Sequence, residues 1–237
     1  MSAEMPQILT YRHPKVGNRV DLVGVVHVQS PQFFRNVGAF LAARVAEGAV
    51  VHYEGVRQNT PEEIAQAPRA DRYKMRLLAP FSDYAEGQVA RSSDPQRVLQ
   101  EDSWLPAGAE NHDVSQLDIA ERIPFKRALI ISALVQAVPL VTKEKQLNES
   151  LEAAVQAQPA ASDEAQPPSG FQSPLLQELN EVFIDYRNEV ALDAFDTLQA
   201  QRPGTDACLV WGDDHLPGLA SGLRSRGYQP FAHPMQH

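Results

Sequence analysis

The chain has 237 residues, enough for one large domain or one domain with an insertion, and its 43% hydrophobic and 22% charged residues are typical of a globular protein. Its formal net charge of −9 argues against binding nucleic acid or anionic lipid, because both need a cationic surface. The single cysteine, Cys208, excludes an internal disulfide and a cysteine-rich zinc site, and its apolar neighbours predict a buried thiol.

The first part of the chain predicts a strand, a helix and a second strand. No basic segment followed by an apolar core opens the sequence, so we expect no signal peptide and a cytoplasmic location. Valine-rich Arg19–Val28 predicts a strand buried on both faces. Ser30 and Pro31 suit the start of a helix that continues to Val45. Ala49–Tyr53 is the second strand, and this order implies a parallel crossover.

The middle of the chain predicts a mainly helical insertion over residues 60–155. Arg69–Gln88 predicts a helix that is interrupted at Pro80. The most apolar part of the chain is too short to span a bilayer, so we expect no membrane association. It predicts a helix over Pro124–Val138 that is buried in the core or forms a contact in a homo-oligomer. Residues 156–172 are rich in Pro, Ala and Gln, which is typical of a flexible linker.

The last part of the chain follows a similar pattern. An apolar stripe predicts a long helix that ends near Gln201. A strand over Ala207–Trp211, a short helix over Leu216–Arg226 and an edge strand over Tyr228–Ala232 follow it. The whole pattern predicts a single α/β domain over residues 1–237. It would have a mixed, mostly parallel central sheet, flanking helices and the helical insertion.

Two Gly-x-x-His sequences follow predicted strands at opposite ends of the chain. The first runs from Gly24 to His27 and the second from Gly212 to His215. Because the carboxyl ends of parallel strands line one crevice, two neighbouring strands of this kind would aim both imidazoles into it. Histidine at such a place binds a metal or transfers protons near neutral pH. One such sequence indicates little, since a lone histidine at a strand end is more often a structural hydrogen bonder, but two in matching contexts indicate a site.

Glu54, Arg187 and Asn188 are further candidates for this site. Glu54 ends the second strand, and a carboxylate beside two histidines is the ligand set of a catalytic metal centre, or a base paired with an electrophile. Arg187 and Asn188 lie in the long helix, where they would hold the carboxylate or bind substrate oxygens. The alternatives are a surface carboxylate that opens a loop and a solvated helix face.

The polar segment around His112 and Asp113 leaves two interpretations open. A His-Asp pair is usually part of a turn, but this pair leads into the apolar helix and could join the crevice, where Asp113 would help to bind a cofactor. His52 alternates with Glu54 and could share its face of the strand, although we interpret it as a satisfied core histidine.

The tail of the chain resembles the ending of TraB/PrgY/GumN (Tiki-like) proteins. It carries an Arg-Asn pair in a helix, then a strand, then Gly-x-x-His-Leu-Pro-Gly and a closing Leu-x-x-x-Gly-Tyr. The sequence LVGVVHV and the later Tyr53-Glu54-Gly55 are similar to the opening of the same family. The resemblance covers Val20–Gly55 and Leu175–Phe231, and it covers the middle of the chain poorly.

The resemblance implies a fold akin to the erythromycin-esterase/ChaN-like superfamily and a defined set of site residues. Tiki members are described as metal-dependent proteases, and PrgY as an inhibitor of a peptide pheromone. Residue by residue, the implied site comprises His27, Glu54, Arg187, Asn188 and His215, with Gly24 and Gly212 shaping the turns. This chain departs from the pattern by placing Asp213 and Asp214 in its second turn, where small residues are usual.

Three hypotheses about function follow. In the first, the protein hydrolyses a peptide or ester bond: His27, Glu54 and His215 hold Mn²⁺, Co²⁺ or Zn²⁺, or act directly on water. Arg187 would then steady the oxyanion, and Asn188 would orient water or substrate. In the second, the protein binds and sequesters a peptide or small-molecule ligand without turnover. In the third, it is an oligomeric structural or regulatory protein.

Overall fold

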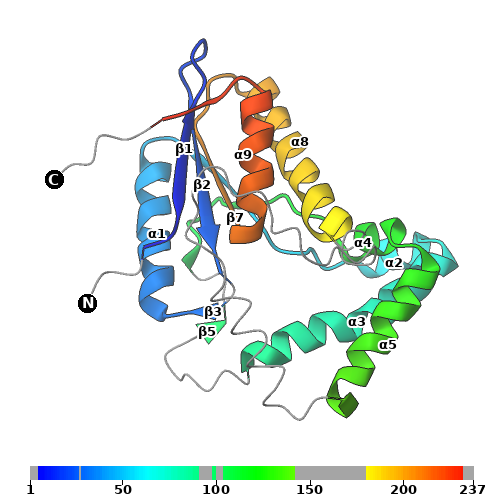
Figure 1. The fold of residues 1–237 in the computed structure, drawn as a ribbon. Coiled ribbons are helices and arrows are strands. Elements are labelled where there is room, and N and C mark those ends of the chain that lie inside the picture. The colour runs from blue at the N-terminus through cyan, green and yellow to red at the C-terminus, as the bar shows by residue number, and fades with distance from the viewer. Residues whose placement is uncertain (1–4, 27, 91–97, 100–103, 142–179, 232–237) are drawn as a thin grey trace, which may run out of the picture.

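The computed structural model describes residues 5–26, 28–90, 98–99, 104–141 and 180–231 (Figure 1). At its centre is a six-stranded sheet in the order β6-β4-β7-β2-β1-β8. Strands β2, β7, β4 and β6 run parallel, whereas β1 pairs antiparallel with both β2 and β8. The predicted mixed, mostly parallel α/β fold is confirmed. The strands are β1 (Ile8–Arg12), β2 (Arg19–Val25), β4 (Val50–Tyr53), β6 (Glu110–Asn111), β7 (Ala207–Gly212) and β8 (Gln229–Pro230).

Strand β7 comes from the last part of the chain yet lies between β2 and β4, which come from the first part. Its residues pair in parallel with β2 on one side and with β4 on the other. Val25 lies opposite Gly212 across the first pair, and Tyr53 lies opposite Val210 across the second. The carboxyl ends of β2, β7 and β4 therefore meet at one edge of the sheet, where ligands bind in open α/β sheets.

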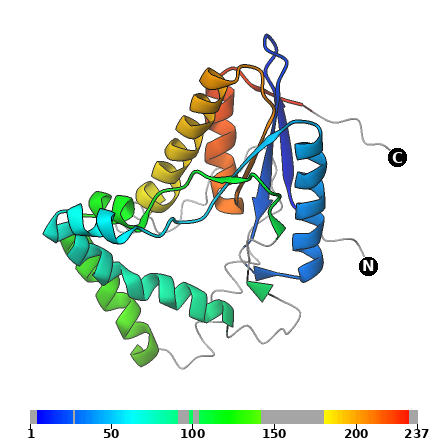
Figure 2. The ribbon, with the colours of Figure 1, turned by 180° about the vertical axis from the view of Figure 1, so that it is seen from behind.

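Helices cover both faces of the sheet (Figures 1 and 2). Helix α1 (Pro31–Ala46) lies on one face, and the side chain of Ser30 caps it by accepting a hydrogen bond from the Phe33 amide, as the sequence predicts. Helices α8 (Tyr186–Gln201) and α9 (Leu216–Ser225) lie on the other face (Figure 1). Cys208 of β7 is fully buried in the core on the α1 side, which confirms the predicted buried thiol.

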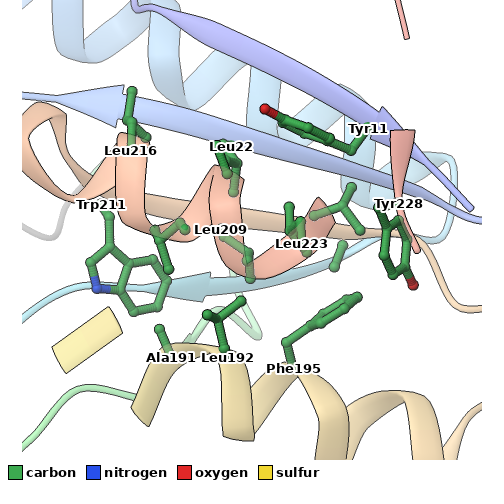
Figure 3. Packing of buried hydrophobic residues seen from close by; sticks show 14 of the residues in the cluster. Tyr11, Leu22, Ala191, Leu192, Phe195, Leu209, Trp211, Leu216, Leu223 and Tyr228 are labelled. Atoms are coloured by element: carbon green, nitrogen blue, oxygen red, sulfur yellow. The ribbon is translucent and has the colours of Figure 1, made fainter. Parts of the chain in front are cut away.

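The core under α8 and α9 fixes the position of both helices on the sheet. Side chains of β7, α8 and α9 meet there in one cluster, which includes Leu209 and Trp211 of the strand, Phe195 of α8 and Leu223 of α9 (Figure 3). Gly222 allows α9 to approach α8, because a Cβ at that position would overlap Leu192. Each fully buried leucine or phenylalanine contributes about 1.5–3 kcal/mol, so this packing sets where the helices present their polar residues.

The region between β4 and α8 is mainly helical in its described part. It contains α2 (Pro61–Gln66), α3 (Arg69–Ala90), α4 (Gln116–Arg122) and α5 (Phe125–Val141). Helices α3 and α5 pack together and extend away from the sheet (Figures 1 and 2). None of the helices in the described ranges has both the length and the apolar character needed to cross a bilayer.

Several predicted boundaries change in the structure. The interruption of α3 at Pro80 is wrong: the helix continues to Ala90, because its packing against α4 and α5 offsets the proline's cost of about 3 kcal/mol. The first predicted strand is split, since β2 ends at Val25 and Val28–Gln29 forms β3, which pairs with the short strand β5 (Val98–Leu99). The predicted linker 156–172 lies outside the described residues.

Candidate functional site

The ends of β2 and β7 bring the glycines of both Gly-x-x-His sequences together. Gly24 lies opposite Trp211 in the register, one residue before the pair of Val25 with Gly212. A Cβ on Gly24 would overlap the carboxylate of Asp213 and lie 2.8 Å from Leu216 Cδ1. A Cβ on Gly212 would lie 3.1 Å from Glu54 Oε2. Both strand ends therefore pack too closely to accept a side chain without movement of their neighbours.

Arg187 of α8 lies between two buried carboxylates. Its Nη2 donates to Glu54 Oε1 at 2.6 Å and to Asp113 Oδ2 at 2.5 Å, and its Nε donates to Asp113 Oδ1 at 3.0 Å. The backbone N–H of Gly212 donates to Glu54 Oε2, and that of Gly55 donates to Asp113 Oδ2 at 3.1 Å. This network joins the end of β4, the segment after β6, helix α8 and the end of β7.

The electrostatics of this network favour its charged form. Burial alone would lower the pKa of Arg187, but hydrogen bonds and charge interactions with Asp113 and Glu54 outweigh burial and raise the pKa above its ordinary value. The side chains of Arg187, Glu54 and Asp113 are 10%, 6% and 0% exposed, so water screens their attraction poorly. The guanidinium therefore holds both carboxylates in fixed positions.

His215 is buried beside this network and is held by Asn188. Its Nδ1 lies 2.9 Å from Asn188 Oδ1. An amide oxygen only accepts hydrogen bonds, so Nδ1 carries the proton and Nε2 keeps its lone pair. Nε2 lies 3.6 Å from Glu54 Oε1, beyond direct hydrogen-bonding range. Burial lowers the pKa of His215. The charge of Glu54 raises this pKa and the charge of Arg187 lowers it, and the net result is a pKa below the ordinary value, so the imidazole is neutral at pH 7.

The amide nitrogen of Asn188 is a polar group with no hydrogen-bond partner in the described structure. The residue is 5% exposed, and its Nδ2 is buried. A Cβ on Gly218 of α9 would overlap this nitrogen, so the glycine makes room for the amide. Buried donors are normally paired, and leaving one unpaired costs about 1–3 kcal/mol. Nδ2 is therefore a buried donor without a partner among the described residues.

The structure brings together most of the residues that the sequence selected. Glu54, Arg187, Asn188 and His215 lie in one buried cluster with Asp113, Gly24 and Gly212. The alternatives of a surface carboxylate at Glu54 and a solvated helix face at Arg187 and Asn188 are wrong, because the three residues are 7%, 8% and 5% exposed. His27 lies outside the described residues.

A second group of potential ligands lies where β4 pairs with the edge strand β6. One ligand atom each from His52, Glu110 and His112 lies within 4.8 Å of the others, so this group could hold a metal ion. Burial, and then the charge of His112, lowers the pKa of His52 to about 4. Sequence reasoning treated His52 as a satisfied core histidine and did not consider Glu110. The available signal was the Glu-x-His spacing of residues 110 and 112, which places both side chains on one face of an extended segment.

No protein-family model, no curated protein and no solved structure matches this chain.

Proposed function

We propose that the cluster around Glu54 and His215 is the active site of a hydrolase that cleaves a peptide or ester bond. The observation that carries the proposal is a buried carboxylate 3.6 Å from a neutral imidazole, at the edge where the parallel strands end. A neutral histidine at pH 7 can accept a proton, which is the requirement for a general base. Glu54, Arg187, Asn188 and His215 are also positions that the TraB/PrgY/GumN resemblance implies.

In this proposal His215 activates water, and the other residues hold it in place. Nε2 takes a proton from a water molecule while the water oxygen attacks the scissile carbonyl carbon. The bond to the leaving group then breaks, and the imidazolium returns the proton to the leaving oxygen or nitrogen. Asn188 fixes the histidine through Nδ1, and its unpaired Nδ2 donates to the carbonyl oxygen. The charge of Glu54 stabilises the imidazolium that forms.

Arg187 is a positioning residue in this mechanism. The sequence suggested that it steadies the developing oxyanion, but its Nε and Nη2 donate to Asp113 and Glu54 and its Nη1 donates to the Phe183 carbonyl at 3.4 Å. Its charge is compensated by two carboxylates, so its contribution is to fix Glu54 beside His215. Asn188 is the better donor to the substrate oxygen.

A metal-dependent form of the same site remains part of the proposal. Glu54 Oε1 and His215 Nε2 are 3.6 Å apart, close to the spacing of about 3.4 Å between two ligands of a tetrahedral cation. Mn²⁺, Co²⁺ or Zn²⁺ on these residues, with His27, would polarise the scissile carbonyl. Arg187 donates to the same oxygen of Glu54, and its positive charge opposes a cation there, so we favour direct action on water.

The test is turnover of a panel of peptide and aryl ester substrates by purified protein, with and without chelator. His215→Asn and Glu54→Gln should each lower kcat/KM by about 100-fold or more, the usual contribution of general acid–base catalysis. Glu62→Gln, an exposed carboxylate on α2, is the matched control and should retain full activity. Loss of activity in chelator, restored by Mn²⁺, Co²⁺ or Zn²⁺, would select the metal-dependent form. Saturable binding of an intact peptide without product would support the sequestering function instead.

A further inference from the structure

His52, Glu110 and His112 meet where the edge strand β6 pairs with β4. The register places His52 directly opposite Glu110, and His112 follows two residues later. His112 Nε2 lies 2.9 Å from Glu110 Oε2, and the rings of His52 and His112 are 4.1 Å apart between centroids. Two neighbouring imidazoles and a carboxylate are thus gathered from two strands that are about sixty residues apart in the chain.

The burial of these residues differs in a way that suits a metal site at the protein surface. His52 is 1% exposed, whereas the side chains of His112 and Glu110 are 34% and 51% exposed. Nδ1 of His52 is buried without a hydrogen-bond partner in the described part of the chain. His52 is therefore not the satisfied core histidine that the sequence suggested. His52 would be a fixed ligand on the protein side of the metal, whereas His112 and Glu110 can adjust their positions. The remaining coordination positions would then face water.

We propose that His52, Glu110 and His112 bind a zinc ion at this edge of the sheet, apart from the cluster around Glu54. Two histidines and one carboxylate form a ligand set that zinc takes with an open fourth position. Ligands of a tetrahedral zinc ion lie about 3.4 Å apart, so the 2.9 Å pair of His112 and Glu110 must open slightly, and all three ligand atoms already lie within 4.8 Å of one another. Glu110 and His112 are the residues with room to make this adjustment.

Zinc at this place would fix the segment that carries Asp113. The strand β6 has only two residues. Asp113 is the next residue after His112, and its carboxylate accepts a hydrogen bond from Arg187. A metal held by β4 and by residues 110–112 ties this short strand to the sheet. The proposal does not depend on the proposed hydrolase, because binding and stability can be measured without turnover. We expect zinc to raise the melting temperature of the metal-free protein.

The test is titration of the metal-free full-length protein with Zn²⁺ against a chromophoric chelator, with thermal unfolding at each zinc concentration. We expect one site per chain and a higher melting temperature in zinc. His112→Ala and Glu110→Gln, both at partly exposed positions, should weaken binding by at least about 100-fold, since even outer-shell changes cost about 10–100-fold. His13→Asn, in the β1–β2 turn, is the matched control and should bind zinc like the wild type.

Two results would overturn the zinc site. One is the absence of saturable binding in the wild type, and the other is binding that persists unchanged in both His112→Ala and Glu110→Gln. A His215→Asn variant separates this site from the proposed active site. If that variant alone loses zinc, the metal belongs with Glu54, and the edge site is refuted while the metal-dependent hydrolase is supported.

Discussion

Replacing Arg187 with methionine should destabilise the protein by about 3 kcal/mol, because the change leaves two carboxylates buried without a cation. The side chains of Glu54 and Asp113 are 6% and 0% exposed. Removing one partner of a buried ion pair costs about 3–5 kcal/mol. We expect the lower end of this range, since the backbone N–H groups of Gly212 and Gly55 still donate to the two carboxylates.

The measurement is urea unfolding of the wild type, Arg187→Met, Glu54→Gln and the double variant. The two effects should not add, and their coupling should be about 1–3 kcal/mol, as expected for residues in one ion-pair network. Adding Asp113→Asn to the double variant should recover much of the lost stability, because no charge then stays buried without a partner. In thermal unfolding, the loss of 3 kcal/mol corresponds to a melting temperature lower by about 6–12 °C.

Arg35→Met is the control for the loss of a surface guanidinium. Arg35 is exposed on α1 and donates to Gln32 of the same helix, so its replacement should change the free energy of unfolding by less than about 0.5 kcal/mol. If Arg187→Met costs less than about 1 kcal/mol and adds to Glu54→Gln without coupling, the buried network does not hold the strand ends and α8 together.

Two further predictions concern His215 and the Asn188 amide that holds it. Gly218→Ala would place a methyl group against the amide of Asn188, so it should destabilise the protein by about 1–3 kcal/mol in urea unfolding, whereas Ser221→Ala, exposed on the same helix, should be neutral. Alanine has a higher helix propensity than glycine, so a Gly218→Ala variant more stable than the wild type would show that the overlap with Asn188 does not exist. The pKa of His215 is lowered chiefly by burial, so the unfolded chain binds a proton on this histidine more readily than the folded protein does. The stability that the neutral His215 contributes is therefore present above about pH 6.5 and falls as the pH drops below that value. In urea unfolding at several pH values, His215→Asn should lose less stability on acidification than the wild type, and equal losses would count against the lowered pKa.

Much of the sheet could be predicted from local sequence because its central strands are buried on both faces. The valine-rich β2 and the apolar β7 stand out for this reason, and the Ser30 cap marks the start of α1. The strand β1 was not predicted, since Ile8–Arg12 is half-exposed and is held by pairing with β2. The continuation of α3 past Pro80 also depends on tertiary packing, which no local pattern reports.

The residues of the site divide in the same way. Glu54 and His215 could be placed from sequence, because each follows a recognisable strand whose end is fixed by the parallel sheet. Asp113 and His112 could not be resolved, because their positions depend on β6 pairing with β4 across a long stretch of chain. Because of that pairing, the two adjacent side chains have different partners: Asp113 accepts a hydrogen bond from Arg187, and the ring of His112 contacts the ring of His52.

The most direct measurement of the central claim compares the rate of product release by the wild type and His215→Asn at pH 7.5 on the best peptide or ester substrate found. Our account predicts measurable turnover by the wild type, with the variant slower by about 100-fold or more while its melting temperature stays within a few degrees of the wild type. Equal rates in the two proteins, with the cluster intact, would contradict the assignment of His215 as the base.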